Sequence, residues 1–422
     1  MAITAVVVVI VAALIGVAQF KLGPGKVVLQ PMLWALLISA AWGISARYLP
    51  SGLRIDLPLQ RYSASLLNAG LLLFVAKLGI TVGGSLPQVR EAGWGLLFQE
   101  FGHAFGTLAL GLPLALMLGI KREAVGSTFS VGREPNIAII GERYGMDSPE
   151  GRGVLAEYIT GTVLGALFIA VFAGFITSLN IFHPISLAMG AGVGSGSMMA
   201  AGVGAIAELH PELNKEIGAV AAASNLLTTV FGFYFTMFLS LPTCSWLYGK
   251  LEPVIGRLTK RGRTASAEPS HTIEEELSHA PQFGDSLLAW GVISLGVVIG
   301  NVITYKAGWL VSLEGVLIVA CVVILCEIAK RLIPRMPLLL VVSVVATLAG
   351  LPGLFPFSTA LAEINGQINF LNYTTPVLAL AGFSAAKDLP VFRRLSWRIV
   401  LVSLTATAGT FLGATVVAEF FH

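Results

Sequence analysis

The sequence predicts an all-α membrane protein with about eleven transmembrane helices, two re-entrant hairpins and internal inverted repeats. Only 12% of the 422 residues are charged and 55% are apolar, whereas a soluble domain carries about 25% charged residues. Hydrocarbon does not hydrate charge, so such a chain is expected in a bilayer. Apolar runs of about 20 residues, the length that crosses a bilayer, recur along the chain.

The continuous apolar runs are predicted to be transmembrane spans. They cover residues 3–20, 27–46, 62–80, 92–119, 151–179, 212–243, 285–304, 308–330, 337–357, 365–387 and 394–420. The first run lacks the basic flank and the cleavage site of a signal peptide, so we expect it to remain as a span.

Two further apolar segments, 122–142 and 185–207, are interrupted at their midpoints. Arg133, Glu134 and Pro135 interrupt the first segment, and the glycine-serine run Gly190–Ser197 interrupts the second. A polar or unwound tip is tolerated at membrane depth only where protein or a cavity surrounds it. Both segments are therefore predicted to be re-entrant hairpins.

The distribution of lysine and arginine sets the predicted orientation. With the N-terminus inside, eleven spans and two hairpins, most basic residues fall in cytoplasmic loops, as the positive-inside rule requires. Only Lys77 and Arg133 then lie within the membrane, and the C-terminus lies outside. Four regions follow: N-terminal scaffold and repeat helices (1–120), a hairpin-containing core (121–243), a cytoplasmic linker (244–284) and C-terminal repeat helices (285–422).

Two internal repeats agree with this orientation. At an offset of 303 residues, Gly79, Leu86-Pro87, Arg90 and Trp94 match Gly382, Leu389-Pro390, Arg393 and Trp397. At an offset of 62, Val131-Gly132 and Pro149-Glu150 match Val193-Gly194 and Pro211-Glu212. The first repeat predicts inverted copies, and the second places the two hairpin tips opposite each other.

The segments LGITVGGSLPQVREAGW and AGFSAAKDLPVFRRLSW and the hairpin GVGSGSMMAAG resemble elevator-type secondary transporters. These include the sodium–glutamate symporters, the 2-hydroxycarboxylate transporters and the bile acid–sodium symporters. The stretch SVGREPNIAIIGERYGMDSPEGRGVLAEYITGT is similar to a family of bacterial membrane proteins without assigned function. The resemblance implies a scaffold that forms a homodimer, a mobile core and a site at the hairpin tips. We expect the scaffold helices of the dimer within residues 1–60 and 305–357.

The hairpin tips are the predicted substrate site. Helix N-termini offer N–H donors to a carboxylate, and an arginine at the membrane centre needs a partner because charge is costly there. Close packing of small residues and an ion pair of Arg133 with Glu134 or Glu157 are the competing interpretations. The predicted substrate-binding residues are Arg133, Asn136, Gly194, Ser195, Gly196 and Ser197.

Polar residues inside the neighbouring spans are the predicted coupling-ion site. Carboxylates, hydroxyls and amides coordinate sodium or carry protons, although they also bond helix to helix. The predicted set is Glu157, Ser224, Asn225 and Thr228. Glu100 and His103 share a helix face at i, i+3, where they either relay protons or bond neighbouring helices.

These observations predict an ion-coupled transporter of a small organic anion, a carboxylate, in a bacterial inner membrane. The coupling ion is sodium or a proton, and no other cofactor is expected. A cation–proton antiporter or exporter, a regulatory or holin-like membrane component, and an intramembrane enzyme remain as alternatives. No nucleotide-binding or hydrolase motif is present, so we expect neither an enzyme nor catalytic residues. The three cysteines show no metal-binding spacing, and the basic residues lie in short loops, which argues against nucleic acid.

Overall fold

The structure is a computed structural model that describes residues 1–22, 25–84, 86–131, 134–145, 148–192, 194–255, 283–332, 338–369, 371–393 and 395–421. Within these residues the chain is helical apart from one antiparallel hairpin of two strands, β1 (Ala18–Leu22) and β2 (Gly25–Leu29). The predicted helical fold class is confirmed apart from this hairpin. The sequence predicts two spans here, 3–20 and 27–46, joined by a short loop, so residues 18–20 and 27–29 are strand where a span is predicted.

Six helical stretches of the described chain are long and apolar enough to cross a membrane. They are Ser51–Gly84, Gly93–Met117, Pro149–Ser178, Phe283–Thr304, Trp309–Lys330 and Trp397–Glu419. Shorter apolar helices accompany them at Ala2–Ile15, Pro31–Ile44, Gly196–Leu209 and Val341–Gly350. Helices of this number and composition indicate a multi-pass membrane protein.

Among its described residues, the first third of the chain up to Met117 contains four helices and two short 3₁₀ turns in addition to β1 and β2. The elements are α1 (Ala2–Ile15), α2 (Pro31–Ile44), η1 (Ala46–Tyr48), η2 (Ser51–Leu53), α3 (Leu57–Gly84) and α4 (Leu86–Met117). Gly93 interrupts α4 with φ 35° and ψ −115°, a left-handed conformation that glycine adopts readily. The straight part of α4 therefore begins at Trp94.

The middle third contains the two segments predicted to be hairpins. Each is a pair of short helices: α5 (Glu123–Thr128) with α6 (Glu134–Tyr144), and α9 (Pro184–Gly192) with α10 (Gly196–Leu209). Longer helices with one π-helical turn follow each pair: α7 (Pro149–Thr160), η3 (Gly161–Gly165) and α8 (Ala166–Ser178), then η4 (Pro211–Leu213), α11 (Asn214–Phe235), η5 (Thr236–Ser240) and α12 (Leu241–Ile255). Helix α12 continues past residue 244, where the linker was predicted to begin. Residues 256–282 of that linker lie outside the described chain.

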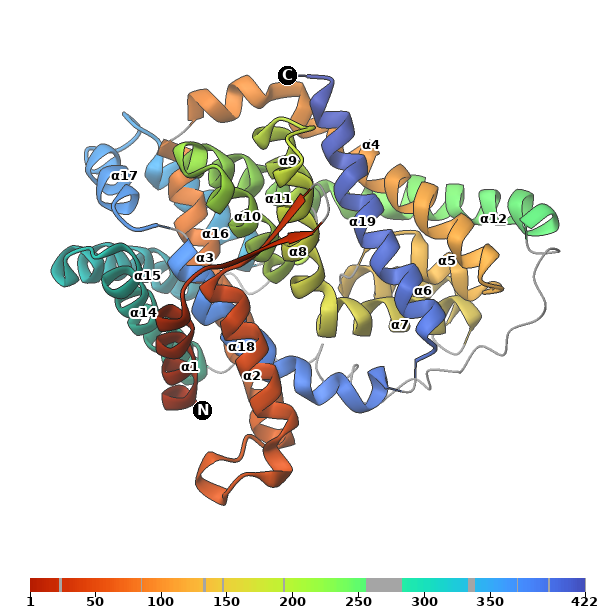
Figure 1. Cartoon of the computed structure of the whole chain (residues 1–422). Helices are drawn as coiled ribbons and strands as arrows, with labels where there is room; N and C mark the ends of the chain where they lie inside the picture. Colours follow the sequence, from red (N-terminus) through yellow and green to blue (C-terminus); the bar gives the residue numbers. More distant parts are fainter. Residues whose placement is uncertain are drawn as a thin grey trace.

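The last third is helical again, with α14 (Phe283–Tyr305), α15 (Trp309–Leu332), α16 (Leu338–Gly350), α17 (Ser358–Gly366), α18 (Leu371–Phe392) and α19 (Trp397–Glu419). Helices α1, α14 and α15 gather on one side of the molecule (Figure 1). Helices α4 to α7, α12 and α19 gather on the other side, and α3 and α8 to α11 lie between the two groups.

Helices α4 and α19 cross in direct backbone contact, through glycines spaced four residues apart (Figure 1). A Cβ on Gly102 would lie 2.1 Å from the carbonyl oxygen of Gly413, and one on Gly106 would lie 2.1 Å from that of Gly409. The contacts descend α19 as they ascend α4, so the two helices are antiparallel. Small residues at such a crossing allow the closest approach of two helices in a membrane.

The crossing point joins positions that are equivalent in the 303-residue repeat. Gly106 faces Gly409, and the hydroxyl of Thr107 lies 2.6 Å from that of Thr410 in a hydrogen bond. Two helices related by a two-fold axis touch at equivalent positions only where the axis passes. These contacts therefore place a pseudo-two-fold axis at Gly106 and Gly409.

Other helix pairs follow the same axis. Helix α3 packs on α16, where a Cβ on Gly79 would lie 3.0 Å from the carbonyl oxygen of Ser343, and the equivalent helix α18 packs on α2, where Gly382, the equivalent of Gly79, approaches the carbonyl oxygen of Leu36. The two segments of the 62-residue repeat contain elements in the same order, since α5, α6 and α7 correspond in sequence to α9, α10 and α11. Helix α5 follows α4 directly, whereas α9 starts beside the end of α19, where Glu419 accepts a hydrogen bond from the backbone N–H of His183.

Trp94 and Trp397, another equivalent pair, begin the straight part of α4 and the whole of α19. Their residues are 66% and 64% exposed, respectively. Since the helices are antiparallel, the two indoles lie at opposite ends of the crossing pair. Exposed tryptophans at both ends of a helix pair are typical of the two interfaces of a bilayer.

Replacing Gly106 with alanine is expected to lower the free energy of unfolding by about 1–3 kcal/mol, because the new methyl group would overlap the backbone of α19. The thermal unfolding midpoint in lipid nanodiscs measures this change. Gly291→Ala in α14 is the matched control, since a Cβ there meets no atom within 4 Å. Equal midpoints for the two variants would contradict the glycine-mediated crossing.

Candidate functional site

The break between α9 and α10 lies at the centre of the candidate site. Helix α9 ends at Gly192, Gly194 has φ 111°, and Ser195 begins α10 as its N-cap, where its hydroxyl accepts from the N–H of Met198 at 3.4 Å. A φ of this sign is strained for any residue with a side chain, so glycine is required at position 194. The hydroxyls of Ser195 and Ser197 lie 3.2 Å apart.

Side chains of α11 hold the end of α9 and the carbonyl of Gly194. The amide nitrogen of Asn225 donates to the carbonyl oxygen of Gly192 at 2.6 Å and to that of Gly194 at 3.3 Å. The Ser224 hydroxyl donates to the carbonyl oxygen of Met189 at 2.8 Å. Carbonyls at the end of a helix have no partner within it, so these bonds supply partners that water would otherwise provide.

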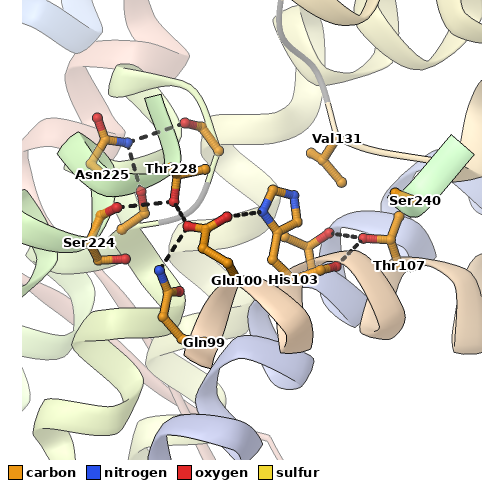
Figure 2. Close-up of polar contacts among 12 residues, drawn as sticks. Gln99, Glu100, His103, Thr107, Val131, Ser224, Asn225, Thr228 and Ser240 are labelled. Atoms are coloured by element: carbon orange, nitrogen blue, oxygen red, sulfur yellow. Dashed lines mark hydrogen bonds and ion pairs between the residues drawn. The ribbon is translucent and has the colours of Figure 1, made fainter. Parts of the chain in front are cut away.

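Thr228 connects α11 to a buried carboxylate on α4. Its hydroxyl donates to Oε1 of Glu100 and also lies 3.0 Å from the carbonyl oxygen of Ser224 (Figure 2). Gln99 Nε2 donates to the same Oε1 at 2.9 Å, and His103 Nδ1 lies 3.6 Å from Oε2. Glu100 is 2% exposed and His103 is 6% exposed.

The same network reaches the axis of the fold. Thr107 donates to the carbonyl oxygen of His103 at 2.7 Å, and its hydroxyl is the one that meets Thr410 of α19. A continuous row of polar groups therefore runs from the α9–α10 break through α11 and α4 to the α4–α19 crossing (Figure 2). Inside an apolar bundle such a row is stable only when its members are hydrogen-bonded to one another.

The region between α5 and α6 is the counterpart of this break in the other hairpin segment. Asn136 Nδ2 donates to the carbonyl oxygen of Val131 at 3.3 Å, and the Ser240 hydroxyl donates to that of Phe129. Arg133, the charged residue of the predicted substrate site, lies outside the described residues. Its role therefore stays a prediction.

Ion pairs join the start of α5 to the start of α7. Arg122 Nη2 lies 2.5 Å from Glu150 Oε1, and Arg152 Nη2 lies 3.2 Å from Glu123 Oε1. Glu150 and Glu123 are largely buried. These reciprocal pairs hold the start of α5 against the start of α7.

The structure brings together most of the predicted polar residues of one half of the site. Ser224, Asn225 and Thr228 share one network with Gly194, while Ser195 and Ser197 lie at the adjoining start of α10. Glu157 is elsewhere, on α7, and is 1% exposed. Asn136 lies in the other hairpin segment.

Two residues matter more in the structure than in the sequence interpretation. Glu100 is hydrogen-bonded to Thr228, one of the residues predicted to bind the coupling ion, and Gln99, which the sequence does not single out, bonds the same carboxylate. The Gln99 Oε1 atom is buried without a hydrogen-bond partner within the described chain. The spacing of Glu100 and His103 was visible in the sequence, but the contact with a residue 128 positions away was not.

Lys77 forms a separate buried polar site, on α3. Its ammonium donates to the carbonyl oxygen of Asn365, near the last residue of α17. The C-terminal end of a helix carries partial negative charge, which stabilises a cation there. Asn365 returns a bond from its amide to the Thr81 hydroxyl at 3.1 Å, so this cluster ties α17 to α3.

The arrangement at the α9–α10 break offers groups that can bind a polar ligand. It offers backbone carbonyls, hydroxyls, an amide and one carboxylate–imidazole pair, all in the interior of an apolar helix bundle. Among the described residues no group of three or more histidine, cysteine, aspartate or glutamate side chains could hold a metal ion. Such sets of intramembrane polar groups typically mark the path of a substrate or an ion.

Fold and site together define a helical multi-pass membrane protein with a polar site buried at a helix break. Residues 10–250 match the model of a family described as "Protein of unknown function (DUF3100)", and the chain belongs to this family. No curated protein and no solved structure matches the chain. The matched residues include α9 to α11 and α4, so the whole polar row up to Thr107 lies in the part that defines the family.

Replacing Asn225 with alanine is expected to loosen the α9–α10 break, because the carbonyls of Gly192 and Gly194 would lose their shared donor. Leaving a buried hydrogen-bonding group without a partner costs about 1–3 kcal/mol of stability. The loosening is measured in a protein that carries Ser195→Cys and, to remove the exposed thiol, Cys321→Ser. We expect a thiol reagent to modify the cysteine at position 195 faster when Asn225 is replaced.

Gln30→Ala is the control for this measurement. Gln30 is also a buried amide, but it donates to the carbonyl oxygen of Gly204, in the second half of α10. It should leave the reactivity at position 195 unchanged. An Asn225→Ala protein with the parental rate of modification would show that this amide does not hold the break.

Proposed function

We propose that the protein is an ion-coupled secondary transporter of a small organic anion. One observation carries the proposal: a buried carboxylate, Glu100, is hydrogen-bonded through α11 to the helix break at Gly192–Ser195. In a coupled transporter, binding of the ion at the coupling group must change the affinity of the substrate site. A row of hydrogen bonds between the two supplies that contact.

The location of the carboxylate supports transport over a purely structural role. An ionisable group at membrane depth costs about 2.5 kcal/mol or more, so it normally faces a partner, a cavity or an ion path. Glu100 lies on a helix that is long and apolar enough to span a membrane, and its described partners are neutral except for His103. Structural cross-linking of α4 to α11 would need only a hydroxyl or an amide at this position.

The proposed substrate is an anion, a carboxylate, because the break ends in the N-terminus of a 14-residue helix. Its first N–H groups carry partial positive charge and suit a carboxylate. Ser195, Gly196 and Ser197 leave the backbone of this helix start accessible to a ligand. Arg133 would approach from the opposite hairpin and grip the same carboxylate with its planar fork of donors.

The proposed mechanism is an elevator movement in a chain with eleven spans and two re-entrant hairpins. The hairpin segments would move with α4 and α19, on which both pack, relative to a scaffold drawn from the remaining helices. The pseudo-two-fold axis supports this, because inverted repeats provide two similar arrangements that open to opposite sides. A homodimer through scaffold helices in a bacterial inner membrane completes the proposal.

A cation–proton antiporter is the second candidate, and the Glu100–His103 pair is the observation that favours it. The two candidates differ in what stabilises the protein. An anion symporter binds carboxylates, whereas an antiporter responds to cations alone. A regulatory or holin-like membrane component would respond to neither.

A screen of small carboxylates by thermal unfolding in nanodiscs tests the proposed function. A substrate present at about 100 times its Kd raises the free energy of unfolding by about 2.7 kcal/mol. We expect at least one carboxylate to stabilise the protein and to be taken up by proteoliposomes. A protein that no carboxylate stabilises, in sodium or potassium buffer, would contradict anion transport.

Arg133→Lys and Arg133→Gln are expected to weaken binding of that carboxylate by at least about tenfold, since lysine keeps the charge but loses the bidentate geometry. Binding is measured by the dependence of the unfolding midpoint on ligand concentration. Arg54→Gln, at an exposed position, is the control. Unchanged affinity in both Arg133 variants would remove this residue from the site.

A further inference from the structure

Glu100 and His103 form a buried acid–base pair one turn apart on α4. His103 Nδ1 lies 3.6 Å from Glu100 Oε2, and both side chains are almost fully buried. Glu100 lies midway between Trp94 and Gly106, about 9 Å along the helix from each. The pair therefore sits between one predicted membrane interface and the centre of the crossing.

The groups around Glu100 favour a proton over a metal cation. Oxygen ligands surround a bound sodium ion, but Oε1 of Glu100 meets two hydrogen-bond donors, Gln99 Nε2 and the Thr228 hydroxyl. The imidazole of His103 lies beside the other oxygen, with Nδ1 3.6 Å from Oε2. Imidazole is the side chain whose charge normally changes between about pH 5 and 8.

Thr228 has one hydroxyl proton and two acceptors within reach. It donates to Oε1 of Glu100, and the carbonyl oxygen of Ser224, one turn back in α11, lies 3.0 Å away. A hydrogen bond to an ionised carboxylate is roughly twice as strong as one to a neutral acceptor. The charge of the Glu100–His103 pair therefore decides which acceptor Thr228 prefers.

We propose that Glu100 and His103 together bind the coupling proton and that Thr228 transmits its presence to the α9–α10 break. This inference rests on the proposed transport function. Without the proton the pair carries one negative charge, and Thr228 holds α11 to α4. One added proton on Oε2 of Glu100, the oxygen that faces Nδ1 of His103, neutralises the carboxylate, and the Thr228 hydroxyl turns to the carbonyl of Ser224.

The movement reaches the break because α11 holds it directly. Ser224 and Asn225 bind the carbonyls of Met189, Gly192 and Gly194. When Thr228 releases Glu100, α11 and the break lose one attachment to α4 together. Proton binding at Glu100 thereby changes how firmly the proposed substrate site is held against the α4–α19 pair.

Other titratable or charged groups on the elements packed against α4 lie mainly toward helix ends. Helix α9 and the turn η5 have none. The described partners of Lys77, Glu123 and Glu252 are Asn365, Arg152 and Lys121. The complete set on α3, α5, α11, α12 and α19 is Arg61, Tyr62, Lys77, Glu123, Lys215, Glu216, Tyr234, Cys244, Tyr248, Lys250, Glu252, Arg398 and Glu419.

Hydrogen exchange of the full chain in nanodiscs tests the proposal. Exchange is followed in peptides covering 186–192 and 194–200 between about pH 5 and 8, corrected for the intrinsic pH dependence of amide exchange. In the parent protein we expect protection to change about fivefold over this range, because one charge-assisted bond is exchanged for a neutral one. Glu100→Gln and Thr228→Val should each abolish this change.

Two controls separate a proton switch from general loosening. Thr177→Val removes a buried hydroxyl that donates to the carbonyl oxygen of Ala173 in its own helix at 2.7 Å, and Glu157→Gln neutralises another buried glutamate, the rival coupling group that the sequence predicts. Both should keep the parental response. A parental response in Glu100→Gln and Thr228→Val would overturn the proposal, as would its loss in Glu157→Gln. If Glu100→Gln does not fold, Glu100→Asp and His103→Gln replace it, with altered and abolished responses expected.

Sodium chloride and carboxylates complete the experiment. Protection of these peptides that changes with sodium chloride but not with pH, and that no longer changes in Glu100→Gln, would assign a metal cation to the pair. This result would overturn the proposed proton site. Stabilisation by a carboxylate without any pH response would leave the proposed function standing and refute the proton site. A pH response that depends on Glu100, without stabilisation by any carboxylate, would support the proton site and refute anion transport.

Discussion

The backbone contact between α4 and α19 is the constraint on which the rest of the structure depends. Glycines at 102, 106, 409 and 413 bring the two main chains so close that a single methyl group would overlap them. Because equivalent positions meet there, the contact also sets the symmetry of the fold. The hairpin segments pack on this pair, with α9 and α5 each in contact with both α4 and α19. Their positions relative to each other therefore follow from one crossing rather than from many weak lipid-facing contacts.

The candidate site illustrates how polar groups can be placed in an apolar bundle. Side chains in the row satisfy buried hydrogen-bond acceptors. Asn225 donates to carbonyls at a helix end, and Thr228 and Gln99 donate to a carboxylate. None of these bonds would be needed if α9 and α10 formed one continuous helix without Glu100. The break and the carboxylate are thus costly features that support each other, a combination typical of functional rather than purely structural positions.

Much of this fold could be predicted from the sequence, because hydrophobic length and glycine-serine interruptions act locally. The span predicted over residues 394–420, found as a helix at Trp397–Glu419, and the break within 190–197 are examples. The repeat of Gly79 and Trp94 predicted equivalence, but equivalence alone does not say that Gly106 touches Gly409. The β1–β2 hairpin was missed because five-residue strands look like a loop between two spans, although Gly23-Pro24-Gly25 is a turn signal. Glu100 was noticed beside His103, but its bond to Thr228 depends on tertiary packing. Arg133 lies outside the described residues, so its part in the site stays a prediction.

The exposed tryptophans that begin the two crossing helices make membrane thickness relevant to the site. Helix α19 has 23 residues, which corresponds to about 34 Å of helix, whereas a typical hydrocarbon core is about 30 Å thick. Helices longer than the core tilt, and a thinner bilayer requires more tilt. Since α4 and α19 are antiparallel and joined at their middle, extra tilt opens the angle at Gly106 and Gly409. Glu100 lies about 9 Å from that pivot, so lipid composition acts on the distance between α4 and α11.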